Sequence, residues 1–255
     1  MKVLVVGDSC QDIFVYGDIN RICPEGPVPV FNRDWEKGND GMALNVVANL
    51  ESLGAEVKCV TNSEGIIKTR YVDKRSNQLV LRVDNNDISE RIVKNVLYDI
   101  RNNQYNDWEF DALVIADYNK GFLEEDDIAY LCQNNKNVFI DTKKQIDEYM
   151  LECSYIKINE IEYKALRHFA IDMWYDDKLI VTLGESGCMY NDERYLTEPV
   201  TGGDVSGAGD TFMAALVVEY CNTNHILSAI KYALKAATIV VQKSGVSTIK
   251  REDIK

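Results

Sequence analysis

Short runs of apolar residues recur along the chain at intervals that suit a parallel sheet. The runs are rich in Val and Ile and end at a glycine or a polar residue, as buried strands do; they cover residues 3–6, 112–116, 138–140, 155–158 and 179–183. Stretches of helical length separate most of them, such as 88–104 and 124–134. This alternation predicts a single α/β domain over residues 1–255, with helices packed on a central, mostly parallel sheet.

Two segments break this alternation. Residues 27–32 and 69–84 have the composition of strands but carry proline and charged side chains. That combination suits a small exposed sheet better than a buried layer. We therefore expect a lid or an interface ribbon, with lid strands around 12–33 and 68–84, and a homodimer formed through these strands is a possible consequence.

Polar residues and a glycine stand where the predicted strands end. Open parallel sheets bind ligands outside the carboxyl ends of their strands, so these positions form a predicted polar rim; they are Asp8, Asp117, Asp141, Asn159 and Gly184. Any one of the aspartates can instead be a helix cap. Their recurrence in one chain favours a ligand site.

Composition and charge exclude several classes of function. A formal net charge of −13 and the lack of Lys or Arg runs argue against nucleic-acid binding, because a polyanion would be repelled. Seven scattered cysteines without a CxxC pair indicate free thiols. The apolar run after Lys2 is too short for a signal peptide, and no segment approaches the ~18 apolar residues of a membrane span, so we expect a cytoplasmic protein. With two histidines in all, chemistry would depend on carboxylates, lysines and backbone amides.

The segment 204–220, DVSGAGDTFMAALVVEY, predicts a buried helix whose first turn offers bare amides. Gly207, Ala208 and Gly209 let an anion approach the positive end of the helix dipole, so phosphate is the expected ligand. Asp210 would repel a phosphate, so its presence is explained if it accepts the proton of a hydroxyl that attacks the phosphate. The alternative is that Asp210 only caps the helix. The segment is neither a Walker A loop nor a dinucleotide GxGxxG motif, because no GK[ST] follows and Phe212 occupies the last position.

Residues 204–212 resemble the DTxGAGDxF signature of the ribokinase-like (phosphofructokinase B type) carbohydrate kinases. The resemblance implies a three-layer ribokinase-like sandwich with a small β lid, and ATP with Mg²⁺ as cofactor. It also implies that Asp210 is the catalytic base and that Gly207, Ala208 and Gly209 form the anion hole.

Other motifs are similar to one branch of that family, the D-glycero-D-manno-heptose 7-phosphate kinases of ADP-heptose synthesis. They are VVGDSCQDIF with RICPEGPVPVF in 5–31, GMALNVVANLESLG in 41–54, KTR in 68–70, NQLVLRVD in 77–84 and ADYNKG in 116–121. The resemblance implies that a sugar phosphate is held by Asp8, Asp12, Gly41, Asn45, Lys68, Arg70 and Lys120.

The nucleotide side is implied by NEIE at 159–162, VTLGESG at 181–187, DTKK at 141–144 and the segment 233–248. Their resemblance to family elements gives ATP-binding roles to Lys143, Asn159, Thr182, Gly184, Gly187 and Lys243, and a magnesium site held through water to Asn159 and Glu162. On their own, the lysines can equally be solvated and the glycines can simply form turns.

Three departures from the branch limit what the resemblance implies. Met42 replaces the second glycine of a double glycine, Leu234 replaces an asparagine beside the adenine, and a strand-and-helix unit is missing between residues 61 and 68. No HxGH element of a nucleotidyltransferase occurs, so we expect the kinase activity alone. The prediction is transfer of the γ-phosphoryl group of ATP to the anomeric hydroxyl of a heptose 7-phosphate. A kinase for another sugar or nucleoside, and a catalytically reduced sugar- or nucleotide-binding protein, stay open as alternatives.

Overall fold

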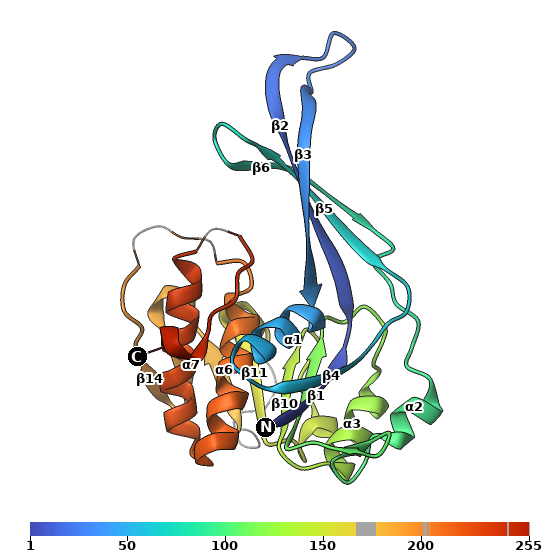
Figure 1. The fold of residues 1–255 in the computed structure, drawn as a ribbon, viewed down its shortest axis with the longest axis vertical. Coiled ribbons are helices and arrows are strands. Elements are labelled where there is room, and N and C mark those ends of the chain that lie inside the picture. Colours follow the sequence, from blue (N-terminus) through green and yellow to red (C-terminus); the bar gives the residue numbers. More distant parts are fainter. Residues whose placement is uncertain (167–176, 201–202, 204, 244, 255) are drawn as a thin grey trace.

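The main sheet contains the strands that the apolar runs predict. The computed structural model describes residues 1–166, 177–200, 203, 205–243 and 245–254. Six strands run parallel in the order β12-β11-β10-β9-β1-β4, and the antiparallel strands β13 (Cys188–Tyr190) and β14 (Glu193–Tyr195) extend the sheet beyond β12 (Figure 1). The parallel strands are β1 (Lys2–Gly7), β4 (Glu56–Thr61), β9 (Ala112–Asp117), β10 (Val138–Thr142), β11 (Tyr155–Asn159) and β12 (Leu179–Thr182).

Alternate side chains of each strand enter two separate cores. Val3 and Val5 of β1 pack on one side of the sheet, and Leu4 and Val6 pack on the other; none of the four is exposed. Because both faces are covered, the strand reads as a continuous apolar run rather than as an alternation of polar and apolar residues.

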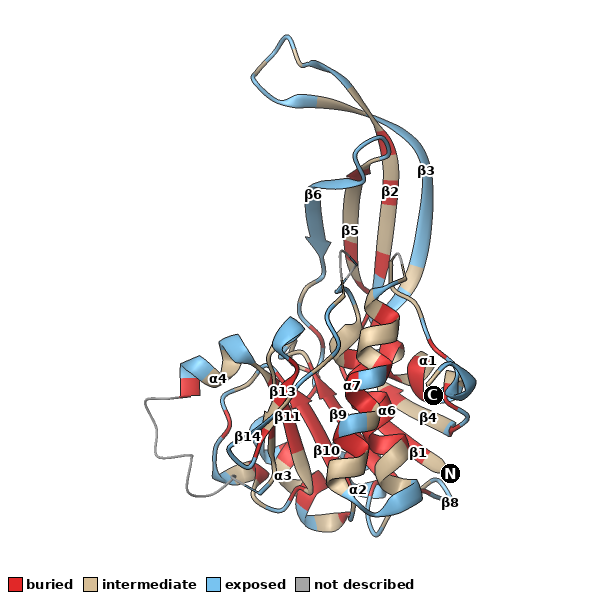
Figure 2. Ribbon diagram, turned by 90° about the vertical axis from the view of Figure 1, so that its left-hand side faces the viewer, coloured by how far each residue is buried: buried red, intermediate tan, exposed pale blue. Residues whose placement is uncertain are grey.

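Helices cover both faces and make three layers, as predicted. One core contains residues of α1 (Ala43–Ser52), α6 (Ala208–Thr223) and α7 (Ile226–Val241). The other contains residues of α2 (Lys94–Asp99), α3 (Glu125–Asn134), η1 (Glu148–Met150) and α4 (Glu160–Leu166). Figure 2 shows the buried residues concentrated in this body. The short elements β7 (Gln104–Tyr105), β8 (Trp108–Glu109), η2 (Gly184–Ser186) and η3 (Arg251–Asp253) complete the described structure.

A four-stranded lid sheet rises from the body (Figure 1). Its order is β3-β2-β5-β6, from β2 (Ser9–Ile22), β3 (Pro29–Met42), β5 (Ile66–Asp73) and β6 (Gln78–Asn85). The predicted lid segments are thus confirmed as strands, but β3 is longer than expected and leads directly into α1. The sequence did not signal residues 34–40 as a strand because they are almost all exposed and have no apolar period.

The helix predicted over 88–104 is wrong. Only Lys94–Asp99 is helical, and β7 and β8 form a hairpin in place of a longer helix. Ile88 and Val93 are 81% and 65% exposed, so the apolar positions there do not share a buried face. Asn102 and Asn103 have φ angles of 52° and 56°, which no helix accommodates.

The connection between β4 and the lid is short. Only residues 62–65 separate β4, the last strand of the main sheet, from β5. The seven cysteines are free thiols, four of them buried. Among the described helices, none has both the length and the apolar character needed to cross a membrane. Asp204, the first residue of the segment 204–220, and His168, one of the two histidines, lie outside the described residues.

Candidate active site

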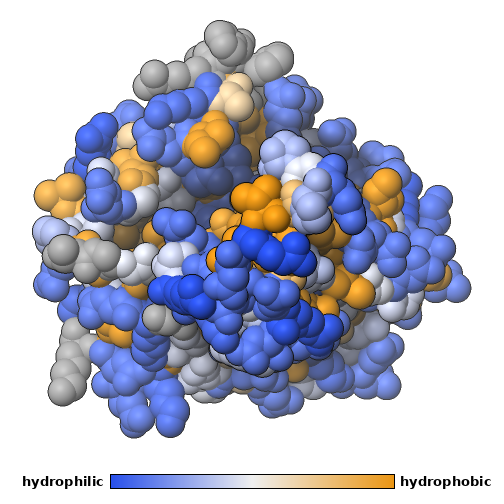
Figure 3. Space-filling view, turned by 90° about the horizontal axis from the view of Figure 1, so that it is seen from above, coloured by the Kyte–Doolittle hydropathy of each residue, from blue (hydrophilic) through white to orange (hydrophobic). Residues whose placement is uncertain are grey.

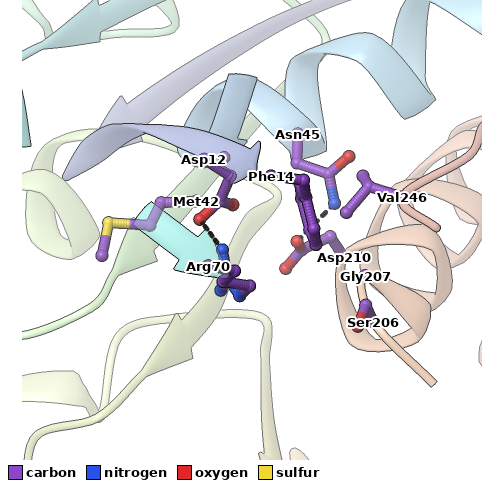
Figure 4. A pocket seen from close by; sticks show the side chains of 10 residues that line it. Asp12, Phe14, Met42, Asn45, Arg70, Ser206, Gly207, Asp210 and Val246 are labelled. Carbon is purple, nitrogen blue, oxygen red and sulfur yellow. Dashed lines mark hydrogen bonds and ion pairs between the residues drawn. The ribbon is translucent and has the colours of Figure 1, made fainter. Parts of the chain in front are cut away.

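A small cavity lies where the lid meets the first turns of α1 and α6 (Figure 4). Its volume is about 170 Å³, and its walls come from β2, the end of β3, α1, β5, α6 and the C-terminal segment. Six predicted site residues are brought together here, with four that were not predicted; the ten are Asp12, Phe14, Gly41, Met42, Asn45, Arg70, Ser206, Gly207, Asp210 and Val246.

Asp210 lies in the first turn of α6 with both carboxylate oxygens engaged. Asn45 Nδ2 donates to Oδ2 at 2.6 Å, and the Tyr118 hydroxyl donates to Oδ1 at 2.5 Å. Burial raises the pKa of Asp210; the two hydrogen bonds oppose that rise, and the charge of Asp141 adds to it. The group is therefore a carboxylate held in one orientation, with greater basicity than a solvated aspartate has.

The N-terminal end of α6 has the geometry expected of an anion site. Gly207 caps the helix at a φ of 78°, and a Cβ at this position would lie 2.9 Å from Asn45 Nδ2. Only glycine meets both conditions without strain. Of the three amides predicted to bind phosphate, that of Ala208 already donates to the Val205 carbonyl at 3.2 Å.

Lys157 is a buried cation at this site that the sequence analysis missed. Its Nζ forms an ion pair with Asp141 Oδ2 and lies 3.4 Å from the Gly209 carbonyl oxygen. Lys157 and Asp141 are each 5% exposed, and Asp141 Oδ1 has no partner among the described residues. The signal was present in the sequence, because a lysine within the apolar run of β11 must be either buried and paired or at an edge.

The face of the lid that points to the cavity carries three cations. Arg70 pairs with Asp12 from the neighbouring strand (Figure 4). Lys68 is 8% exposed and forms no hydrogen bond or ion pair with any residue that the structure describes. Arg82, not predicted as a site residue, lies opposite Arg70 in register and binds Asp84 through two hydrogen bonds of 2.7 Å.

Gly41 and Met42 occupy the double-glycine position of the resembled branch, and their surroundings differ. A Cβ on Gly41 would lie 2.4 Å from Asp12 Oδ2 and 2.7 Å from Cys10 Sγ, so any other residue there would force these side chains to move. Met42 has φ 57° and ψ −130°, a region that disfavours any residue with a side chain. Its side chain is nevertheless buried, being 5% exposed. Such a conformation costs on the order of 1–3 kcal/mol and persists only where packing holds it.

Asp8 and Lys120, which are predicted to contact the sugar, are not among the residues that line the cavity. Asp8 is fully buried, and its carboxylate accepts hydrogen bonds from the amides of Tyr118, Lys120 and Phe122 at 2.8, 3.3 and 3.2 Å. Burial raises its pKa despite these bonds. The Lys120 ammonium group donates to Asp87 at 2.5 Å. Asp8 therefore stabilises the loop after β9, because its two carboxylate oxygens accept hydrogen bonds from three amides of that loop in place of water.

Asn159 and Glu162 form reciprocal hydrogen bonds at the start of α4. The Asn159 amide donates to Glu162 Oε2 at 2.7 Å, the Glu162 amide donates to Asn159 Oδ1 at 2.9 Å, and Lys143 Nζ donates to Glu162 Oε1 at 2.5 Å. Burial by itself lowers the pKa of Lys143, but the charges of Asp141 and Glu162 outweigh it and raise the pKa. No group of three acidic, His or Cys side chains that could hold a metal occurs in the described ranges. The oxygen donors thus fit Mg²⁺ only when phosphates and water supply its direct ligands.

The remaining predicted nucleotide residues lie outside the cavity. Thr182 pairs with Asn159 across the carboxyl ends of β11 and β12, and its hydroxyl donates to the Ile158 carbonyl at 3.2 Å. Gly184 and Gly187 have φ angles of 59° and 88° in the turn toward β13. Lys243 donates to the Thr248 carbonyl at 2.9 Å, so it ties down the C-terminal segment.

Curated relatives and solved structures show which known proteins this chain resembles in sequence and in fold. The chain is 29% identical to the bifunctional protein HldE of Nitratiruptor sp. over 302 residues, and 30% identical to the HldE of Campylobacter jejuni over 298 residues. The two alignments cover 99% and 100% of this chain. Each covers only 64% of the length of the relative. Phosphofructokinase-2 of Escherichia coli has a similar fold, with a TM-score of 0.76 at 13% identity, covering 99% of this chain and 96% of that one. Ribokinase of Thermotoga maritima gives a TM-score of 0.71 at 17% identity, with coverages of 99% and 95%.

The family model described as "pfkB family carbohydrate kinase" matches residues 67–253, well over half of the sequence. This span includes Asp210, the end of α6 that surrounds it, and the lid strands β5 and β6. The chain belongs to the pfkB family of carbohydrate kinases.

Proposed function

We propose that this chain transfers the γ-phosphoryl group of ATP to a sugar phosphate, with the anomeric hydroxyl of D-glycero-D-manno-heptose 7-phosphate as the specific acceptor. The observation that carries the proposal is the position of Asp210, a buried carboxylate at the N-terminal end of a helix, facing a cavity whose other wall is the lid. A carboxylate at a phosphate site has a use if it accepts a proton.

In the proposed step the sugar hydroxyl gives its proton to Asp210 while its oxygen bonds to the γ-phosphorus, and the bond from that phosphorus to the leaving oxygen of ADP breaks. Asn45 and Tyr118 hold the carboxylate in place through their hydrogen bonds. The first turn of α6 would supply positive potential where the phosphoryl group passes, and Lys157, which donates to the Gly209 carbonyl, would hold that turn in place. Magnesium, bound by ATP and water beside Glu162, would neutralise charge on the phosphates.

The cations of the lid support an acceptor that already carries a phosphate. Lys68 is nearly buried and without an ion pair among the described residues, while Arg70 and Arg82 lie on the same face. Asp12 and Asp84 flank Lys68 in register but pair directly with Arg70 and Arg82, so a phosphate would give the Lys68 ammonium group a direct partner of its own. The motifs shared with the heptose kinase branch favour a heptose 7-phosphate over other sugar phosphates.

ADP release tests this proposal directly. The protein would be incubated with ATP, Mg²⁺ and a panel that contains the heptose 7-phosphate, fructose 6-phosphate, ribose and nucleosides. Asp210→Asn is compared with Glu219→Gln, a charge-removing control toward the other end of α6. Heptose-dependent turnover that is lost only in Asp210→Asn supports the proposal. Turnover with another acceptor alone refutes the heptose assignment, and binding without turnover favours a catalytically reduced protein.

We further propose that two copies of the chain pair through the lid. Every residue of β6 is exposed, and Leu81 and Val83 are 54% and 37% exposed. Figure 3 shows apolar side chains among hydrophilic ones on the face seen from the lid end of the molecule. Leu81→Asp should shift a dimer to monomer in light scattering, while Ile161→Asp, on the body and 80% exposed, should not. A wild-type monomer at high concentration would refute the pairing.

A further inference from the structure

Three lid strands meet the body in one small apolar cluster. Cys10 near the start of β2, Met42 at the end of β3 and Ile66 at the start of β5 pack together, and each is at most 5% exposed. Cys10 is paired in register with Ile66 and with Gly41, the neighbour of Met42. We name these three residues the lid-root cluster. Its packing fixes the place from which the lid rises, because the strands diverge from the body only beyond it (Figure 1).

Tyr118 touches both this cluster and the carboxylate of Asp210. Its ring packs against the lid-root cluster, and its hydroxyl donates to Asp210 Oδ1 at 2.5 Å. Its backbone amide donates a hydrogen bond to the buried carboxylate of Asp8, which fixes the main chain at this residue. Burial, and then the charge of Asp210, raise the pKa of Tyr118 well above its ordinary value. Tyr118 therefore keeps its proton and remains a donor to the carboxylate.

Met42 belongs to the cluster against which Tyr118 packs, and its backbone is strained. A glycine would adopt φ 57° and ψ −130° freely, and the resembled branch has a glycine at this position. The buried methionine side chain supplies apolar volume to the cluster that a glycine would remove. The packing of the Met42 side chain offsets the cost of its strained backbone conformation.

We infer that Tyr118 is a positioning residue for Asp210, and that Met42 sets the position of Tyr118, so that the root of the lid is coupled to the carboxylate. The inference rests on the proposed function, in which Asp210 accepts the proton. A lid displaced by sugar binding at Asp12 and Arg70 would thereby alter the hydrogen bonding of the base.

The first test is the pH profile of Tyr118→Phe. The charged and titratable groups around Asp210 are Tyr118, Asp141, Lys143 and Lys157. Losing the donated hydrogen bond removes a stabilisation of the ionised carboxylate, so the acid limb of kcat should move to higher pH and kcat should fall about tenfold. Tyr190→Phe is the matched control, because its hydroxyl donates to the Asp177 carbonyl at 2.8 Å, away from the cavity. An unmoved limb in Tyr118→Phe overturns the inference.

The second test is a double-mutant cycle between Met42→Gly and Tyr118→Phe. If Met42 acts through Tyr118, Met42→Gly should lower kcat at least fivefold alone and less than twofold in the Tyr118→Phe background. Fully additive effects, or a Met42→Gly variant with wild-type kcat, would overturn the coupling. Met42→Ala, which leaves a smaller void, serves the same cycle if the glycine variant does not fold.

A third measurement does not depend on turnover. The difference in unfolding free energy between each protein and its Asp210→Asn derivative, followed against pH, reports the pKa of Asp210. Met42→Gly and Tyr118→Phe should both move that pKa upward, and a shift in neither refutes the inference. Wild-type protein that turns over no acceptor would refute the proposed function alone, because this measurement would still decide the coupling.

Discussion

Replacing Asp210 by asparagine should abolish turnover while stabilising the fold. The substitution conserves shape, and the two donors that face the carboxylate can both be satisfied. The amide oxygen can turn to Asn45 Nδ2, which only donates, and the amide NH₂ can turn to the Tyr118 hydroxyl, which can also accept. No buried polar atom need lose its partner, so activity and stability can be read separately.

The expected magnitudes follow from the environment of the carboxylate. A positioned general base contributes about 10²–10⁴ in rate, so kcat should fall by that factor, or about 2.7–5.5 kcal/mol of transition-state stabilisation. Because burial raises the folded-state pKa of Asp210 above the ordinary 3.8, the ionised group destabilises the native state at neutral pH. Each unit of that elevation is worth about 1.4 kcal/mol, from which the weaker neutral hydrogen bonds of asparagine subtract.

The sign of the pH dependence gives the decisive check. Native protein binds the extra proton between the unfolded and folded pKa values of Asp210, so wild-type stability falls as the pH rises through that window. The advantage of Asp210→Asn should therefore be absent below pH 3.8, grow above it and become constant above the folded-state pKa of Asp210. Urea unfolding from pH 3.5 to 8, with ADP release at pH 8, measures both effects. A variant that keeps more than a tenth of the wild-type kcat would falsify the assignment of the base.

Three further substitutions distinguish residues that stabilise the fold from a residue that contacts the sugar phosphate. Asp8→Ala should lower the free energy of unfolding by at least about 2 kcal/mol, since three buried amides lose their acceptor, with less than threefold change in the KM for the sugar; a large rise in that KM would restore Asp8 as a sugar ligand. Lys157→Met should cost about 3–5 kcal/mol in urea unfolding by leaving Asp141 buried and unpaired, and adding Asp141→Asn should recover most of it. Arg70→Met should raise the KM for the sugar phosphate at least tenfold and leave the KM for ATP unchanged; equal effects on both would contradict its place on the lid.

The fold was predictable wherever a physical pattern was local. Both faces of β1 are covered, so its residues form one apolar run, and glycines beside Asp210 marked the start of α6. Lys157 was missed because its importance depends on Asp141, sixteen residues away, and on a helix that begins fifty residues later. The place of Asp8 after a strand predicted a polar residue at the rim of the sheet, but not its hydrogen bonds to three amides of the loop after β9, because these depend on a segment more than a hundred residues away.

The shortened segment contributes no residue to the cavity. It joins β4, the edge strand of the main sheet, to the lid strand β5. The alignment with the Nitratiruptor relative spans 302 residues, more than the 255 of this chain, as a missing unit requires. A module that only binds has no use for a buried, basic carboxylate beside an anion site, since burial and charge repulsion both oppose the ionised group. The presence of Asp210, held by Asn45 and Tyr118, is therefore better explained by catalysis than by binding alone.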